Sequence, residues 1–314
     1  MSKLDTVQSD TIRSLLKKYL VTRPQVQGAV SPNGGVSTSN YARMAAEREK
    51  EDKKFLEYAV QNGYDPNLTI ENTSVSNKLY QGDSYSVKYN GYNVTIENKT
   101  KNRITRLNLS NLLAGMSQDD KLNFIKTIQK LPAEVLEDMA IELDNLQSTS
   151  GVNMHTVQSN PDFVAGGFYS SDSDSITTKP QHIVHELGHA IDYHGENNSS
   201  RITNNPSFKA AFKTGLSRFI RAGNKQYDYN DRTTWSNRIQ GIAKLSNYCT
   251  ANEKELWAEI YTALTTGSCQ SYNTIVNYFP EAIEVGKKLL ESIRAENHTV
   301  RHNSPTRQII NLLT

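Results

Sequence analysis

The stretch Gln181–Tyr193 constrains this chain most, because it contains an H-E-x-x-H motif on a predicted helix. Pro180 favours a helix start there. Residues four positions apart lie on one face of a helix, so His185 and His189 can offer two imidazole nitrogens to one metal ion. Glu186 lies beside them, where it can take a proton from a water at the ion. The alternative is an ordinary helix whose histidines only pack against their neighbours.

A tetrahedral zinc that keeps one position for water needs a third protein ligand. The metzincin spacing fails, because Asp192 and Gly195 stand where that motif requires glycine and histidine. The segment 252–264 predicts a second helix with an apolar face, and Glu255 and Glu259 lie four residues apart on it. One carboxylate would bind the metal and the other would orient a histidine. A solvated face is the alternative, but the neighbouring residues are apolar and aromatic.

The sequence HELGHAID, followed by Tyr248-x-x-x-x-Asn252-Glu253-x-Glu255-x-x-Ala258-Glu259, resembles the anthrax lethal factor catalytic-domain family. This family includes secreted Pro-Pro endopeptidases of clostridia and belongs to the gluzincin metalloproteases. The resemblance covers roughly residues 150–300, about half of the chain by domain size. One departure is the segment 195–247, which looks longer than in that family and leaves the shape of the cleft open.

The resemblance implies a role for each residue that matches the motif. It implies one catalytic Zn²⁺ bound by His185, His189 and Glu255. It also implies Glu186 as general base, Tyr248 as the group that helps stabilise the oxyanion, and Glu259 as the residue that supports a zinc histidine. We also expect Asp192 to support the ligands without touching the metal. The Pro-Pro preference of some relatives is not carried over.

Residues 163–178 predict a hairpin that leads into the metal helix. The resemblance implies that one of its strands is a sheet edge on which a substrate peptide lies extended. Glycine at this edge would permit a close approach of the two backbones. The expected edge residues are Gly166, Gly167, Phe168 and Tyr169. A plain hairpin is the alternative.

Composition excludes several classes of partner. The net charge is +2, hydrophobic residues make up 36% of the chain and the mean hydropathy is −0.62. We therefore expect no nucleic-acid partner and no membrane span. The expected partner, from the metal motif and the resemblance, is a protein or peptide substrate, and the expected state is a monomer. Two cysteines, Cys249 and Cys269, do not predict a disulfide scaffold. No signal peptide is visible, which fits a cytoplasmic protein, delivery into another cell by a route without a signal peptide, or a secreted protein given without its leader.

The chain as a whole predicts an α+β fold that is mainly helical, with a small mixed or antiparallel sheet and a zincin-type catalytic domain. Asn90-Gly91 between alternating apolar runs predicts a hairpin within residues 79–109, and residues 110–147 predict two helices. Further helices are expected at 41–61, 206–222, 272–279 and 280–295. The expected units are a flexible region with a short helix (1–40), a helical domain with a small sheet (41–147), the catalytic domain (148–300) and a C-terminal tail (301–314).

These observations predict a zinc-dependent endopeptidase that cuts a specific bond in a protein. The resemblance adds a secreted toxin or effector as one setting for this activity. The alternative is a zinc-containing binding protein that has lost its peptidase activity. A structural zinc would normally have four protein ligands, and such a site has no use for Glu186 or Tyr248.

Overall fold

A computed structural model describes residues 38–113, 116–149, 167–170, 175–178, 180–193, 200–228, 231 and 246–302 of the chain. Several predictions lie outside these residues. They concern the N-terminal region up to residue 37, Gly166 and the tail from residue 303.

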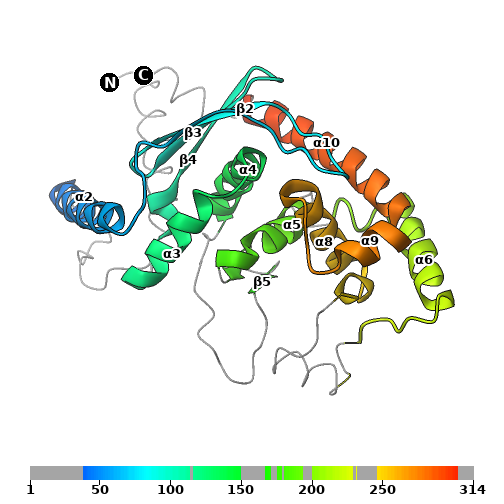
Figure 1. The fold of residues 1–314 in the computed structure, drawn as a ribbon. Coiled ribbons are helices and arrows are strands. Elements are labelled where there is room, and N and C mark those ends of the chain that lie inside the picture. The colour runs from blue at the N-terminus through cyan, green and yellow to red at the C-terminus, as the bar shows by residue number, and fades with distance from the viewer. Residues whose placement is uncertain are drawn as a thin grey trace, which may run out of the picture.

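A four-stranded antiparallel sheet covers one side of the molecule (Figure 1). Its strands, in spatial as well as chain order, are β1 (Thr69–Thr73), β2 (Tyr85–Asn90), β3 (Asn93–Asn98) and β4 (Arg103–Asn108). The predicted hairpin turn is confirmed, since Asn90 pairs with Asn93 and Gly91 takes the positive φ of +61° that this tight turn needs. The prediction missed β1, a polar edge strand whose register is irregular.

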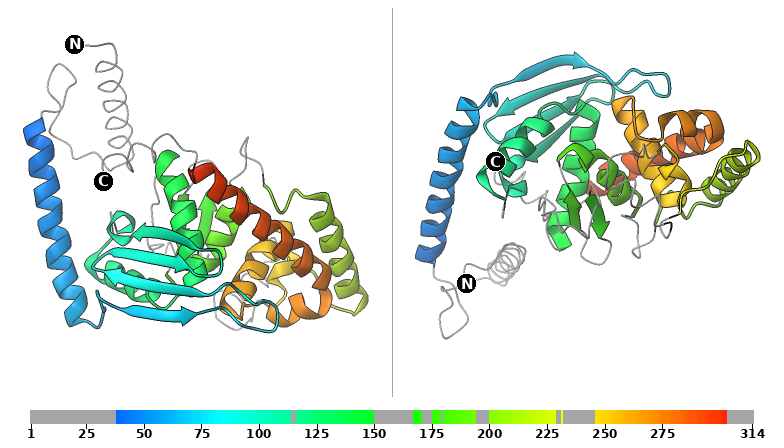
Figure 2. Two further views of the ribbon diagram at one scale, coloured as in Figure 1. Left: turned by 90° about the horizontal axis from the view of Figure 1, so that it is seen from above. Right: turned by 60° about the horizontal axis from the view of Figure 1, so that its bottom comes forward.

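Two helices lie under the sheet, as Figure 2 shows from two further directions. They are α3 (Gln118–Ile128) and α4 (Ala133–Thr149). The two helices predicted within residues 110–147 are present, and each has a start signal: the Ser117 hydroxyl accepts the Asp120 N–H, and Pro132 directly precedes α4. A longer helix, α2 (Thr38–Gln61), contributes Phe55 and Ala59 to the core beside the sheet.

The second half of the chain is mainly helical. A 3₁₀ turn, η2 (Pro180–His182), leads into α5 (Ile183–Tyr193), and the hairpin β5 (Gly167–Ser170) and β6 (Ser175–Thr178) precedes it. The remaining elements are α6 (Pro206–Arg221), η3 (Tyr248–Thr250), α8 (Glu253–Thr266), α9 (Tyr272–Tyr278) and α10 (Pro280–His302). Helix α5 packs against α8, and α10 packs against α6. Helix α10 is longer than predicted, so residues 296–302 are helical and the tail begins later than residue 301.

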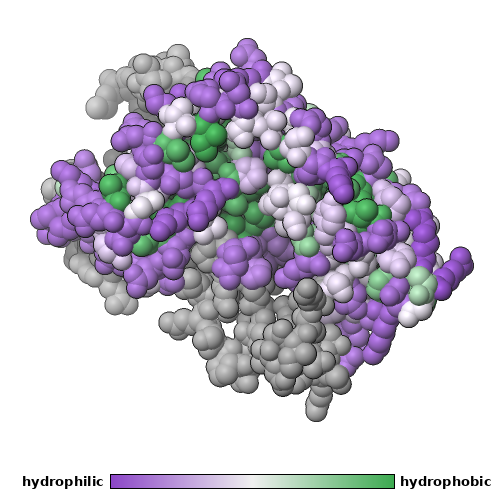
Figure 3. All heavy atoms as spheres, viewed as in Figure 1, coloured by the Kyte–Doolittle hydropathy of each residue, from purple (hydrophilic) through white to green (hydrophobic). Residues whose placement is uncertain are grey.

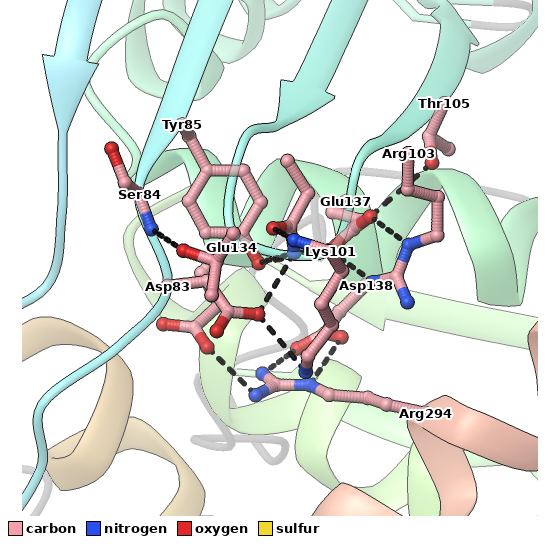
Figure 4. Close-up of polar contacts among 12 residues, drawn as sticks. Asp83, Ser84, Tyr85, Lys101, Arg103, Thr105, Glu134, Glu137, Asp138 and Arg294 are labelled. Carbon is pink, nitrogen blue, oxygen red and sulfur yellow. Dashed lines mark hydrogen bonds and ion pairs between the residues drawn. The ribbon is translucent and has the colours of Figure 1, made fainter.

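The two halves share one hydrophobic core, so the predicted boundary between residues 147 and 148 does not divide the packing. A buried polar network crosses the same boundary, and Figure 4 shows Arg294 of α10 reaching Asp138 and Glu134 of α4. The Arg294 Nε–Asp138 Oδ1 distance is 2.9 Å. Tyr261 of α8 also donates to Asp138, at 2.9 Å. Long-range contacts of this kind lie beyond sequence patterns, which report neighbours along the chain.

The predicted α+β class is confirmed, with helices predominating and a small antiparallel sheet. In the described part of the chain, no helix has both the length and the apolar character needed to cross a membrane. The face of the molecule in Figure 3 is mostly hydrophilic, with apolar residues in small separate areas.

Candidate metal centre

Close packing of α5 against α8 brings the predicted ligands together. The cause is Gly188, the fourth residue of the H-E-x-x-H motif, where a Cβ would lie 3.1 Å from the Ala258 Cα and 3.3 Å from Tyr261. The Trp257 Nε1 also donates to the Gly188 carbonyl at 2.8 Å, which joins the two backbones across the contact. A residue with a side chain at 188 would separate the helices that carry the histidines and the glutamates.

Three donor atoms converge between these helices. The Glu255 Oε2 lies 3.2 Å from the His185 Nε2 and 3.5 Å from the His189 Nε2. Ligand atoms of all three residues lie within 4.8 Å of one another. Tetrahedral ligands about 2.0–2.1 Å from a zinc ion are separated by roughly 3.3 Å. The two separations are close to this value, so these three side chains could hold one zinc ion, and the metal-binding group found among the described residues has no fourth protein ligand.

Glu259 fixes the orientation of the first histidine. Its Oε1 lies 3.4 Å from the His185 Nδ1, and its Oε2 accepts the backbone N–H of Ser271 at 2.8 Å. A carboxylate on Nδ1 leaves Nε2 available as the metal donor and makes the imidazole more basic. The structure therefore separates the roles that spacing left open: Glu255 faces both histidines, and Glu259 lies behind one of them.

The site is electrostatically prepared for a cation. Burial alone would lower the pKa of His185, but hydrogen bonds to Glu255 and Glu259 outweigh it and raise that pKa to about 10. Burial would raise the pKa of Glu255, yet its hydrogen bonds to His185 and His189 hold this pKa well below its usual range. The pKa of Glu259 is lowered against the effect of burial as well, chiefly by its hydrogen bond to His185. Two ionised carboxylates therefore surround the imidazole nitrogens.

Glu186 lies against strand β5 and is 4% exposed. Burial raises the pKa of its carboxyl, while a backbone N–H from Tyr169 stabilises the ionised form. Gly167 is required at this contact, since a Cβ there would lie 2.9 Å from the Glu186 Oε1 and 2.4 Å from the Thr178 Oγ1. Strand β5 thus runs directly beside the predicted general base.

Tyr248 lies on η3, beside the metal ligands. Its ring centroid is 5.9 Å from that of His185, and Tyr227 meets its ring edge-on at a centroid distance of 5.2 Å. The Thr250 hydroxyl accepts the Tyr227 N–H at 2.9 Å, and the Gln226 side chain donates to the Thr250 carbonyl at 2.8 Å. These contacts hold the short turn that carries Tyr248 against the segment after α6.

Asp192 is hydrogen-bonded to the segment that follows α5. Its Oδ1 accepts the N–H groups of Ile202 and Thr203, and its Oδ2 accepts the Thr203 hydroxyl at 2.6 Å. Asp192 therefore anchors the segment after α5, and none of the contacts that the structure describes for it reaches a histidine.

The predicted substrate edge is placed only in part. Gly167 and Tyr169 belong to β5, Phe168 lies between them on the same strand, and Gly166 is outside the described residues. Strand β5 pairs with β6 along one side, with Gly167 opposite Thr178. The Tyr169 N–H is bonded to Glu186, so this group is not available to a substrate strand at that point.

The sequence reading missed three residues that shape the site: Gly188, Trp257 and Ser271. Gly188 carries the only signal that could have been used, because a glycine inside an apolar helix often marks a close approach. Both cysteines are free thiols, and the metal cluster found among the described residues contains neither.

Comparisons with known proteins add no family assignment. No protein-family profile matches the chain, and no curated protein matches it.

Proposed function

We propose that this protein is a zinc-dependent endopeptidase, with one zinc ion held by His185, His189 and Glu255. The observation that carries the proposal is the separation of the Glu255 carboxylate from the two imidazole nitrogens, 3.2 and 3.5 Å. Three protein donors leave a fourth position open, which is typical of catalytic zinc sites rather than structural ones. The donor chemistry of two imidazoles and one carboxylate suits zinc well.

The ion, when bound, would polarise a water molecule and the scissile carbonyl. Glu186 would accept a proton from that water and deliver it to the leaving amine. Its pKa is raised by burial, which brings a carboxyl closer to the neutral range where one group can both take and release a proton. The Tyr169 N–H would hold the carboxylate, and the lack of a side chain at Gly167 lets the carboxylate lie against β5.

Tyr248 would donate a hydrogen bond to the oxyanion that forms on the carbonyl. Its ring lies beside the imidazole of His185 and therefore borders the proposed zinc site, which supports this role. The substrate would be a protein or peptide segment that passes β5, because this strand borders Glu186. The resemblance to secreted proteases makes a toxin or effector the favoured biological setting.

The proposal is tested by incubating a diverse peptide library with the full chain and reading the products by mass spectrometry. Three proteins are compared: zinc-loaded wild type, Glu186→Gln and Glu291→Gln. The last is a matched control, since Glu291 is an exposed residue of α10. We expect internal cuts from wild type and the control, none from Glu186→Gln, and one zinc per chain in all three.

Two results would count against the proposal. Wild-type cleavage rates in Glu186→Gln would remove the assigned base. Bound zinc without any cleavage by wild type would favour the alternative, a zinc-containing binding protein without peptidase activity.

A further inference from the structure

Ser271 occupies the start of α9 and is 1% exposed, yet its hydroxyl does not cap that helix. A serine at a helix start normally accepts an N–H from its own first turn. Here the Ser271 Oγ instead accepts the backbone N–H of Cys249, from η3, at 3.1 Å. A cap given up in favour of a distant peptide group indicates a role beyond starting the helix.

The accepted N–H belongs to the peptide bond that joins Tyr248 to Cys249. A buried N–H that loses its acceptor is unfavourable, so this bond fixes the plane of that peptide unit and with it the direction of the Tyr248 side chain. Cys249 is completely buried, so water cannot take over as acceptor without local opening.

Ser271 also contacts Glu259, the carboxylate that orients His185. The Ser271 N–H donates to the Glu259 Oε2 at 2.8 Å, and the other oxygen of Glu259 faces the His185 Nδ1 at 3.4 Å. Ser271 therefore connects, through one backbone bond and one side-chain bond, the carboxylate that orients a histidine and the turn that carries the tyrosine.

We propose that Ser271 is a positioning residue that sets Tyr248 in register with the metal ligands. This proposal rests on the proposed function and deepens it. Its two bonds have separable effects: replacing the side chain removes the bond to Cys249, while the backbone bond to Glu259 remains. Ser271→Ala should therefore disturb the tyrosine and leave the histidine support in place.

The test is a double-mutant cycle on the full-length, zinc-loaded protein with a peptide that the wild type cleaves. Tyr248→Phe should lower kcat by about 100- to 1000-fold, as expected for one oxyanion donor. Ser271→Ala should lower kcat by about 10- to 100-fold with little change in KM or zinc affinity. The double variant should be no slower than Tyr248→Phe alone, because both changes remove the same interaction.

A matched control removes another buried hydroxyl, at the far end of the helix that carries Glu255. Thr265 of α8 is 1% exposed, and its Oγ1 donates to the Tyr261 carbonyl at 2.8 Å. Thr265→Val deletes this hydroxyl without changing the shape of the side chain, and it should leave kcat close to wild type. Equal losses of kcat in Thr265→Val and Ser271→Ala would mean that general destabilisation is the cause.

Amide hydrogen exchange at Cys249 gives a readout that does not need peptidase activity. We expect faster exchange of this amide in Ser271→Ala than in wild type and in Thr265→Val. Unchanged exchange, or effects of Ser271→Ala and Tyr248→Phe that add in the double variant, would overturn the positioning role. The two proposals can fail separately. If the wild type binds zinc but cleaves no peptide, while Ser271→Ala still speeds exchange of the Cys249 amide, the proposed endopeptidase activity is overturned and the anchoring of the turn by Ser271 is retained.

Discussion

Gly188→Ala is the substitution whose effect can be worked out most fully from the structure. The new Cβ would lie 3.1 Å from the Ala258 Cα and 3.3 Å from Tyr261. Carbon atoms pack at about 3.5–4.0 Å, so α8 has to move by roughly 0.4 Å. Neither neighbour yields easily, because one contact is with backbone and Tyr261 is fully buried and bonded to Asp138.

Two opposing effects decide how Gly188→Ala changes the free energy of unfolding. Alanine in place of a helical glycine contributes about 1 kcal/mol in favour of folding. Overpacking a tight contact costs about 1–3 kcal/mol. We therefore expect the metal-free variant to lose up to about 2 kcal/mol of unfolding free energy, from the difference of these two terms.

The effect on metal binding should be more specific than the loss of stability. Glu255 lies one turn before the contact on α8, so a shift of α8 moves its carboxylate relative to both histidines. A displacement of roughly 0.4 Å exceeds the ±0.2 Å tolerance of metal–ligand distances. We expect the zinc dissociation constant to rise by about tenfold, within the range measured for disturbed ligand support.

Urea unfolding of the metal-free protein and competition with a zinc chelator measure the two quantities separately. Thr214→Ala is the control, because Thr214 is an exposed residue of α6 and tests helix propensity alone. Its zinc affinity should equal that of wild type. A Gly188→Ala variant that binds zinc as tightly as wild type would refute the claim that this glycine sets the spacing of the ligands.

Three further predictions concern the support of the site. Arg294→Met leaves Asp138 and Glu134 buried without their cation, so urea unfolding should show a loss of about 3–5 kcal/mol. Glu259→Leu removes the carboxylate behind His185 and should weaken zinc binding by about 10- to 100-fold in the same chelator competition. The pKa of His185 in the folded state, about 10, exceeds the ordinary value of 6.5. The protonated imidazole therefore stabilises the fold fully below pH 6.5, and this contribution is lost as the pH rises towards 10. Denaturation of the metal-free protein across this window should show the decline, and saturating zinc, which replaces the proton, should suppress it.

Local features of the site were predictable from sequence because they depend on neighbours along the chain. The four-residue spacing of His185 and His189 places both on one face of α5, and the spacing of Glu255 and Glu259 does the same on α8. Caps and turns at Ser117 and Gly91 follow from backbone chemistry in the same way.

Contacts between distant segments were not predictable. The Ser271 hydroxyl bonds an amide 22 residues away, and Arg294 reaches a carboxylate 156 residues away. The domain boundary at 148 was drawn from a polar stretch, but Asp138 and Tyr261 bond across it. The bonds of the Asp192 carboxylate to Thr203, in the segment after α5, had no counterpart in the sequence pattern.

Zinc K-edge X-ray absorption of the full chain, loaded with one equivalent of zinc, tests the central claim most directly. The account predicts tight binding of one ion by two imidazoles and one carboxylate, with a fourth light ligand and zinc–ligand distances of about 2.0–2.2 Å. A sulfur ligand at about 2.3 Å would place a cysteine on the metal and contradict the assigned ligand set. Failure to bind zinc at all would contradict it as well.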